Sequence, residues 1–148
     1  MEINIKDFTE YDFLEYDKWF KHESISSALE YVDQEWLDSV LNQKDFKQIC
    51  IFKDNTLLAV CGIYLPQSEY NYYAISDFSI NPDYQHKGYG SKILNKIINS
   101  NSFNESDCWK ALVSIRNVNA INFFKKNGWN FECNQDNGYS KYYYFKTK

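Results

Sequence analysis

A short glycine-containing segment between a strand-like run and a helix-like run constrains this chain more than any other feature. The segment reads Gln85-His86-Lys87-Gly88-Tyr89-Gly90. Glycine adopts positive φ angles and has no Cβ to block a ligand, so two glycines free a row of backbone N–H groups to face one anion. The helix that begins there adds unpaired amides and the positive end of its dipole. The segment predicts a cradle for a pyrophosphate, with a tight strand-to-helix turn that binds no ligand as the alternative.

The residues on either side favour the cradle. Residues 72–80 are rich in β-branched and aromatic side chains and predict a strand, which Asn81-Pro82-Asp83 ends because proline has no N–H for a ladder. Downstream, four aliphatic residues share one face of a predicted helix: Ile93, Leu94, Ile97 and Ile98.

Two segments then resemble the GNAT superfamily of acetyl-CoA-dependent N-acetyltransferases. Residues 80–90, INPDYQHKGYG, are similar to the cofactor signature V-x-P-x-x-[R/Q]-x-x-G-x-[G/A] of that family. Residues 117–129, NVNAINFFKKNGW, are similar to its later motif N-x-x-A-x-x-x-Y-x-x-x-G-[F/W]. Two ordered motifs at compatible spacing are more specific than either alone, and together they span about Tyr72 to Phe131. The resemblance implies an α/β fold with a central mixed, mostly antiparallel sheet and helices on both faces.

The composition fits one such domain over residues 1–148, because 148 residues close a single core but not two. No apolar run approaches the roughly 20 residues that span a bilayer, and the N-terminus lacks the pattern of a secretion signal, so we expect a cytoplasmic protein. The four cysteines are scattered singly, and Cys50 and Cys61 read as small core residues. His22 and His86 lie too far apart in sequence to indicate a metal site.

Charge is distributed unevenly along the chain. Residues 1–45 hold twelve carboxylates and four lysines, a net of −8, which leaves +4 for the rest of a chain whose total is −4. A basic part suits polyanionic CoA and an acidic part suits a cationic acceptor, although the same charges could simply solvate helix surfaces. The sequence pI of about 5.2 disfavours nucleic acid as a partner.

Periodicity places the other elements. Thr9 and Asp12 resemble a capping box at the start of a helix, and Asn117 and Gly128 read as the N-cap and the end of another. A second helix is predicted over 26–41, where apolar residues recur at steps of three and four. The remaining elements are strands over 2–6, 46–52, 56–65, 109–115, 129–133 and 139–145 and a helix over 88–99.

The resemblance also implies roles for individual residues. Backbone groups of Phe78, Ser79 and Ile80 would contact the pantetheine arm of acetyl-CoA, with the N–H of Phe78 near the thioester oxygen. Asn117 would hydrogen-bond the pantetheine or act only as an N-cap. The pyrophosphate would lie on a further set of residues: Gln85, His86, Lys87, Gly88, Tyr89, Gly90 and Ser91.

The two proton-transfer groups are less well specified. Many family members have a tyrosine at the position of Phe124 that returns a proton to the CoA thiolate, and phenylalanine cannot do this. A free thiol has a pKa of about 8.5, so the thiolate can leave with little help or take its proton from water. One of Tyr142, Tyr143 and Tyr144 on the last strand could also substitute as the proton donor. As the base we single out Asp77, the only acid on its strand, where the spermidine/spermine acetyltransferases have an acidic pair; a hydrogen-bonded strand aspartate is the alternative.

The predicted function is acetyl transfer from acetyl-CoA to a small-molecule or peptidyl amine, such as a polyamine or an aminoglycoside-like compound, by a monomer or a homodimer. Phe124 keeps a second hypothesis open, a non-catalytic acetyl-CoA-binding sensor or interaction module. A dinucleotide-binding domain is a weaker third, because the full three-glycine fingerprint is missing.

Overall fold

The computed structural model describes residues 2–27, 29, 31–68, 71–114, 117–134 and 140–145, of which 114, 133–134 and 140–145 are described by their backbone alone. In chain order the elements are β1 (Ile3–Asp7), α1 (Glu10–Trp19), α2 (Glu23–Ser26), α3 (Gln34–Asn42), β2 (Phe46–Lys53), β3 (Thr56–Tyr64), β4 (Tyr73–Ile80), the 3₁₀ turn η1 (Pro82–Tyr84), α4 (Tyr89–Ile98), β5 (Trp109–Ser114), α5 (Val118–Lys126), β6 (Asn130–Asn134) and β7 (Ser140–Phe145).

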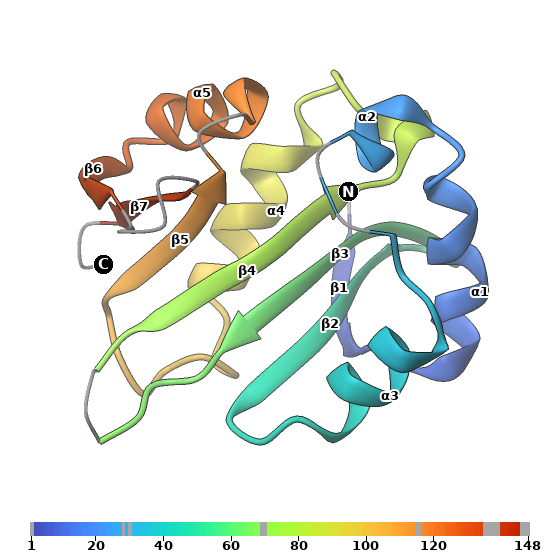
Figure 1. Cartoon of the computed structure of the whole chain (residues 1–148), viewed down its shortest axis with the longest axis horizontal. Helices are drawn as coiled ribbons and strands as arrows, with labels where there is room; N and C mark the ends of the chain where they lie inside the picture. The colour runs from blue at the N-terminus through green and yellow to red at the C-terminus, as the bar shows by residue number, and fades with distance from the viewer. Residues whose placement is uncertain are drawn as a thin grey trace.

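The strands of the described chain form one seven-stranded sheet in the order β1-β2-β3-β4-β5-β7-β6 (Figure 1). Every neighbouring pair is antiparallel except β4 and β5, which run parallel. The mixed, mostly antiparallel sheet predicted from the sequence is therefore confirmed.

Helices cover both faces of the sheet, and each face has its own apolar core. Alternation along β2 explains the division, since Ile49 and Ile51 pack with α4 and α5, whereas Cys50 between them packs with α1, α2 and α3. Figure 1 shows α1, α2 and α3 gathered over the β1–β4 half and α5 over the β5–β7 half. Cys50 and Cys61 are fully buried, as expected for core residues.

The prediction of one continuous helix over 26–41 is wrong. α2 ends at Ser26 and α3 begins at Gln34. Asp33 sets the start of α3 as its N-cap, because its backbone is extended and its side chain accepts a hydrogen bond from the Trp36 N–H at 2.9 Å. Two apolar residues of the predicted stripe still reach the core, since Val32 and Leu37 are buried with α1.

The predicted helix and strand boundaries hold well elsewhere. The Thr9 N–H donates to Asp12 Oδ2 at 2.9 Å, which completes the capping box of α1. Asn117 caps α5 by accepting from the Ala120 N–H at 3.1 Å, and Gly128 leaves the helix at a φ of 85°.

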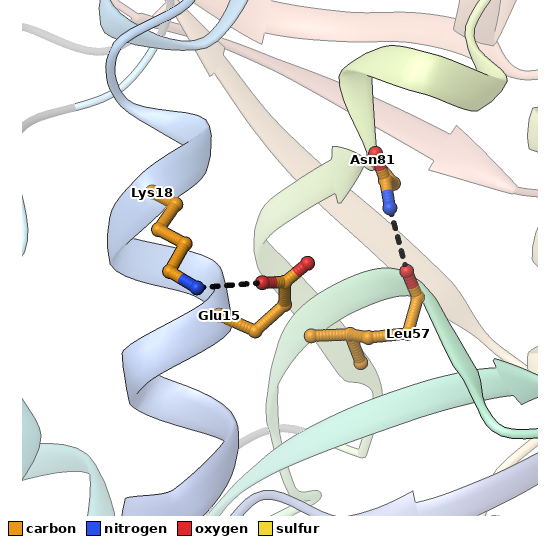
Figure 2. Close-up of polar contacts among 4 residues, drawn as sticks. All are labelled: Glu15, Lys18, Leu57 and Asn81. Carbon is orange, nitrogen blue, oxygen red and sulfur yellow. Dashed lines mark hydrogen bonds and ion pairs between the residues drawn. The ribbon is translucent and has the colours of Figure 1, made fainter.

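One buried side chain fixes the end of β4. Asn81 donates from Nδ2 to the Leu57 carbonyl at 2.9 Å, as Figure 2 shows, and accepts from the Asp83 N–H. The same view shows an ion pair at 3.8 Å between Lys18 and Glu15 on the solvent side of α1. This ion pair is too exposed to add much to the stability of the fold. Asn81, by contrast, anchors the end of β4, from which the chain continues into residues 85–91. We call residues 85–91 the phosphate loop.

Candidate active site

β4 and β5 diverge after a short stretch of parallel pairing. The two strands pair only at Tyr73 with Trp109, Ala74 with Lys110, and Ile75 with Ala111. β4 nevertheless continues to Ile80. No strand of the described chain therefore pairs with this edge of β4 beyond Ile75. We call this opening the seam.

The open edge exposes a defined set of backbone groups. The Asn81 N–H donates to the Leu58 carbonyl, so in the antiparallel ladder Asn81 and Ser79 direct their backbone groups toward β3. Phe78 and Ile80, which alternate with them, direct theirs into the seam. Gln85 already uses the Ile80 carbonyl at 3.1 Å. The Phe78 N–H thus faces the side where the sequence analysis expects the thioester.

The phosphate loop has the backbone of an anion cradle. His86 and Gly88 both have positive φ, at 60° and 81°, and α4 begins at the next residue, Tyr89. Such alternation turns successive N–H groups toward one side, and the first turn of α4 adds its unpaired amides. A Cβ on Gly88 would meet no atom within 4 Å, so the space beside this residue is open.

The second glycine of the loop has a packing role. A Cβ on Gly90 would lie 3.0 Å from Cε1 of Phe123, whose ring stacks on Phe78 at 5.6 Å between centroids. Gly90 therefore lets α5 lie close to α4 at the base of the loop.

A cavity of about 1050 Å³ joins the seam, the phosphate loop, α5 and the 24–39 segment. It is lined by almost every residue predicted to bind the co-substrate, namely Phe78, Ser79, Ile80, Gln85, His86, Gly88, Tyr89, Gly90, Ser91, Asn117 and Phe124. Lys87 does not line it; its ammonium lies 5.5 Å from the ring centroid of Tyr84. The phenol of Tyr89 accepts a hydrogen bond from Lys53 at 3.0 Å, which places a second cation beside the loop.

Phe124 is buried where many family members have a tyrosine. Its ring centroid lies 4.8 Å from that of Trp129, and Phe124 also lines the cavity. The cavity wall therefore has no ionisable group at this position. The alternative proton donors on the last strand, Tyr142, Tyr143 and Tyr144, fall in β7, whose side chains lie outside the described residues.

Asp77 also lines the cavity, on the face of the sheet that α1 covers. Its Oδ2 accepts from Gln48 Nε2 at 3.2 Å and its Oδ1 from Ser76 Oγ at 3.0 Å. Burial raises the pKa of Asp77 above its ordinary value, and hydrogen bonds from Gln48, Ser76 and the Gly62 backbone partly oppose that rise. A carboxylate has about four lone-pair positions, so these three bonds leave room for a hydrogen bond from a substrate.

A second buried polar pair lies beside Asp77. The Tyr16 hydroxyl is 3.1 Å from Ser79 Oγ, and both side chains are buried at the cavity wall. Burial, together with the negative charge of Asp77, raises the pKa of Tyr16, so this phenol keeps its proton at neutral pH.

The far wall of the cavity is acidic and aromatic. It comprises Tyr31, Asp33, Glu35 and Trp36 from the segment between α2 and α3 and from the start of α3. Carboxylates and ring faces both attract ammonium groups. This wall comes from the acidic part of the chain.

Sequence reasoning missed Gln48, Gly62 and Tyr16. Gln48 is a polar residue inside an apolar strand and Gly62 is a glycine inside another, and either signal could have pointed to a special contact. Tyr16 carries no signal in the sequence beyond its place in an apolar helical stripe.

The model of the acetyltransferase (GNAT) family matches residues 9–129 of the chain. The chain belongs to this family. It is therefore an acyltransferase whose co-substrate is acetyl-CoA. The seam and the phosphate loop fit that co-substrate, since they combine free backbone groups, an anion cradle and an open cavity.

Solved structures of acetyltransferases share the fold. An acetyltransferase from Thermus thermophilus superposes with a TM-score of 0.83 at 16% identity, over 98% of this chain and 97% of that one. The spermidine N-acetyltransferase of Vibrio cholerae, in complex with CoA and spermine, gives 0.77 at 12% identity over 97% and 94%. The aminoglycoside acetyltransferase AAC(6')-Ib, in complex with coenzyme A and kanamycin, gives 0.80 at 16% identity over 99% and 95%. No curated protein sequence matches the chain. Within the described chain, every helix is too short or too polar to cross a membrane.

Proposed function

We propose that the chain acetylates a primary amine of a cationic acceptor and that Asp77 is the base. The observation that carries the proposal is the Asp77 carboxylate, fixed by Gln48 and Ser76 at the wall of the cavity into which the seam opens. An acceptor ammonium has a pKa of about 10.4 and must lose a proton before it can attack. Asp77 would take that proton, directly or through one water.

The protonation properties of Asp77 suit this role. Burial raises its pKa above the ordinary aspartate value, which makes the carboxylate a stronger proton acceptor. Tyr16 and Ser79 beside it hold their protons and can position a water or the amine.

Acetyl-CoA supplies the acetyl group, which leaves sulfur for the amine nitrogen as the C–S bond breaks and a C–N bond forms. The Phe78 N–H, directed into the seam, would stabilise the negative charge that develops on the carbonyl oxygen, and a donor of this kind contributes roughly 3 kcal/mol. Because a thiol has a pKa of about 8.5, the thiolate can leave without the phenol that Phe124 lacks.

The acceptor is proposed to carry more than one positive charge. Asp33, Glu35 and Asp77 supply carboxylates around the cavity, and Tyr31 and Trp36 supply ring faces. The structural neighbours solved with spermine and with kanamycin are consistent with a polyamine or an aminoglycoside-like acceptor.

The test measures CoA release with a panel of polyamines, aminoglycosides, lysine-bearing peptides and neutral or acidic amines. The proposal expects the cationic members to react and added salt to raise their KM, because salt screens the attraction of exposed carboxylates. Asp77→Asn is expected to lower kcat/KM at neutral pH by about 10²-fold, the lower end of what a positioned base contributes. A preference for an acidic or neutral acceptor would contradict the acceptor class, and an unchanged pH profile of Asp77→Asn would remove Asp77 from the mechanism.

A further inference from the structure

Gln48 and Asp77 lie on β2 and β4, with β3 between them, and Gly62 is the residue that separates them. The register pairs Gln48 with Gly62 and Gly62 with Asp77, so the three form one row across the sheet. Neighbouring strands are about 4.8 Å apart, which puts the outer two roughly 10 Å apart. A side chain on the middle residue would fill that gap, but glycine leaves it open. Gln48 can therefore reach across β3 to the carboxylate.

The contact is partly buried and specific. Gln48 is 5% exposed, although its same-face neighbours in β2, Phe46 and Cys50, are apolar, and its Nε2 donates to Asp77 Oδ2 at 3.2 Å. Its Oε1 is also buried and has no hydrogen-bond partner among the described residues. A buried amide oxygen without a partner destabilises a fold, so a glutamine here needs a reason other than stability.

The bulge in β4 belongs to the same arrangement. Between Gly62 and Ile63 the register shifts, so that Ser76 is an extra residue in β4. Bulges of this kind redirect a side chain. Here the bulge turns Asp77 onto the α1 side of the sheet, where Gln48 holds one carboxylate oxygen and Ser76 the other.

We infer that Gln48 is a positioning residue for Asp77, which holds the carboxylate through its amide N–H and can turn the amide to accept from Asp77 once that residue is protonated. The turned amide would use Oε1, the atom that otherwise has no partner. One neutral side chain then serves both protonation states of Asp77. The inference rests on the proposed role of Asp77 as the base.

Other groups near Asp77 cannot replace Gln48 in this role. The titratable groups whose pKa responds to the Asp77 charge are Tyr16 from α1 and Cys61 from β3, and burial keeps both protonated. Ser76 contacts only the other oxygen, and the Gly62 contribution comes from the backbone.

The experiment follows the titration of Asp77 directly, by the chemical shift of its carboxyl carbon in ¹³C-labelled protein, together with the pH profile of kcat/KM from pH 5 to 9. Gln48→Leu removes both of these hydrogen bonds at nearly constant volume, and because the bond to the charged carboxylate is the stronger of the two, we expect the Asp77 pKa to rise by about one unit. The acid limb of the profile should move upward with it, while KM for acetyl-CoA stays unchanged. Gln48→Glu keeps the shape but puts a second carboxyl beside Asp77, so the Asp77 titration should move further in the same direction.

Gln34→Leu is the matched control, because Gln34 donates to Asp38 at 3.0 Å in an exposed glutamine–aspartate pair of the same kind. Gln34→Leu should change neither the Asp77 titration nor the pH profile of kcat/KM. Gln48→Leu added to Asp77→Asn should cause no further loss of kcat/KM. The melting temperature of each variant establishes that it is folded.

An Asp77 titration that is the same in wild type and folded Gln48→Leu overturns the inference. A further loss on adding Gln48→Leu to Asp77→Asn also overturns it, since Gln48 would then act elsewhere. Full activity of Asp77→Asn would instead refute the proposed base, and the carboxyl titration would still decide whether Gln48 controls Asp77.

Discussion

The Asp77 carboxylate occupies the space that a side chain on Gly62 would need. A Cβ on Gly62 would contact Asp77 Oδ1, and it would lie 2.6 Å from Ser76 Oγ and 2.8 Å from Phe46 Cζ. All three are side-chain atoms, so the backbone can stay in place while Asp77 moves. Gly62 therefore matters more for the position of the Asp77 carboxylate than for the folding of β3.

Gly62→Ala should separate activity from stability. The added methyl displaces Asp77, and a misplacement of about 1 Å at a reacting group can lower the rate about 10²-fold. The free energy of unfolding should change little. Alanine restricts the unfolded chain, which stabilises the protein by about 0.4–1 kcal/mol and offsets part of the cost of crowding the neighbouring side chains. Steady-state kinetics and a melting curve check this. Wild-type kcat/KM in a folded Gly62→Ala variant would show that Asp77 is not held as described.

Gly88→Val should abolish binding of acetyl-CoA without unfolding the chain. The residue has a φ of 81°, and its side chain would project into the open space of the phosphate loop. Gly128→Val is the matched control, because Gly128 has a φ of 85° and equally open surroundings but does not line the cavity. The measurement is the rise in melting temperature on adding CoA. Equal stabilisation of the Gly88 variant and the parent would refute the cradle.

Phe124→Tyr should be tolerated, with kcat unchanged or higher. The ring of Phe124 is buried against Trp129 and lines the cavity, so we expect a hydroxyl on the ring to reach the departing thiolate. A phenol there would offer the proton that the wild-type chain lacks. Turnover measured from pH 6 to 9 checks this. A large fall in kcat, with an unchanged melting temperature, would show that the cavity needs an apolar wall at this position.

The stability of the protein should depend on pH through Asp77 in an unusual direction. Burial raises the pKa of Asp77 in the folded chain above that of the unfolded chain, so the folded state holds this proton more tightly. The contribution of Asp77 to stability is therefore highest below the unfolded pKa of about 3.9 and falls as the pH rises through the folded pKa. Asp77→Asn cannot ionise, so its melting temperature relative to wild type should be higher at pH 7 than at pH 4. Thermal melts at the two pH values test this, and a difference that is the same at both would contradict it.

Local chemistry made much of this fold predictable. The positive φ values of Gly88 and Gly128 and the cap at Asn117 follow from residue types that favour those conformations. The helix predicted over 26–41 failed for a local reason too. Asp33 prefers to cap a helix rather than to lie inside one, and its preference outweighed the apolar spacing around it.

The environment of Asp77 could not be predicted, because it depends on strand register. Gln48 and Asp77 are separated by 29 positions, and their contact requires that Gly62 pair with both. A shift of one residue in either pairing would place these side chains on opposite faces. The sequence identified Asp77 as the acid of its strand, but only the assembled sheet shows what surrounds it.

The seam between β4 and β5 has a consequence for solvent exchange along a single strand. Ser79 and Asn81 direct their amides to β3, so their protons should exchange slowly with deuterium, whereas those of Phe78 and Ile80 face an edge that no described strand pairs beyond Ile75 and should exchange fast. β4 then carries an alternating slow and fast pattern in the free protein. A ligand that lies along the seam as an added strand would slow the fast positions and make the pattern uniform.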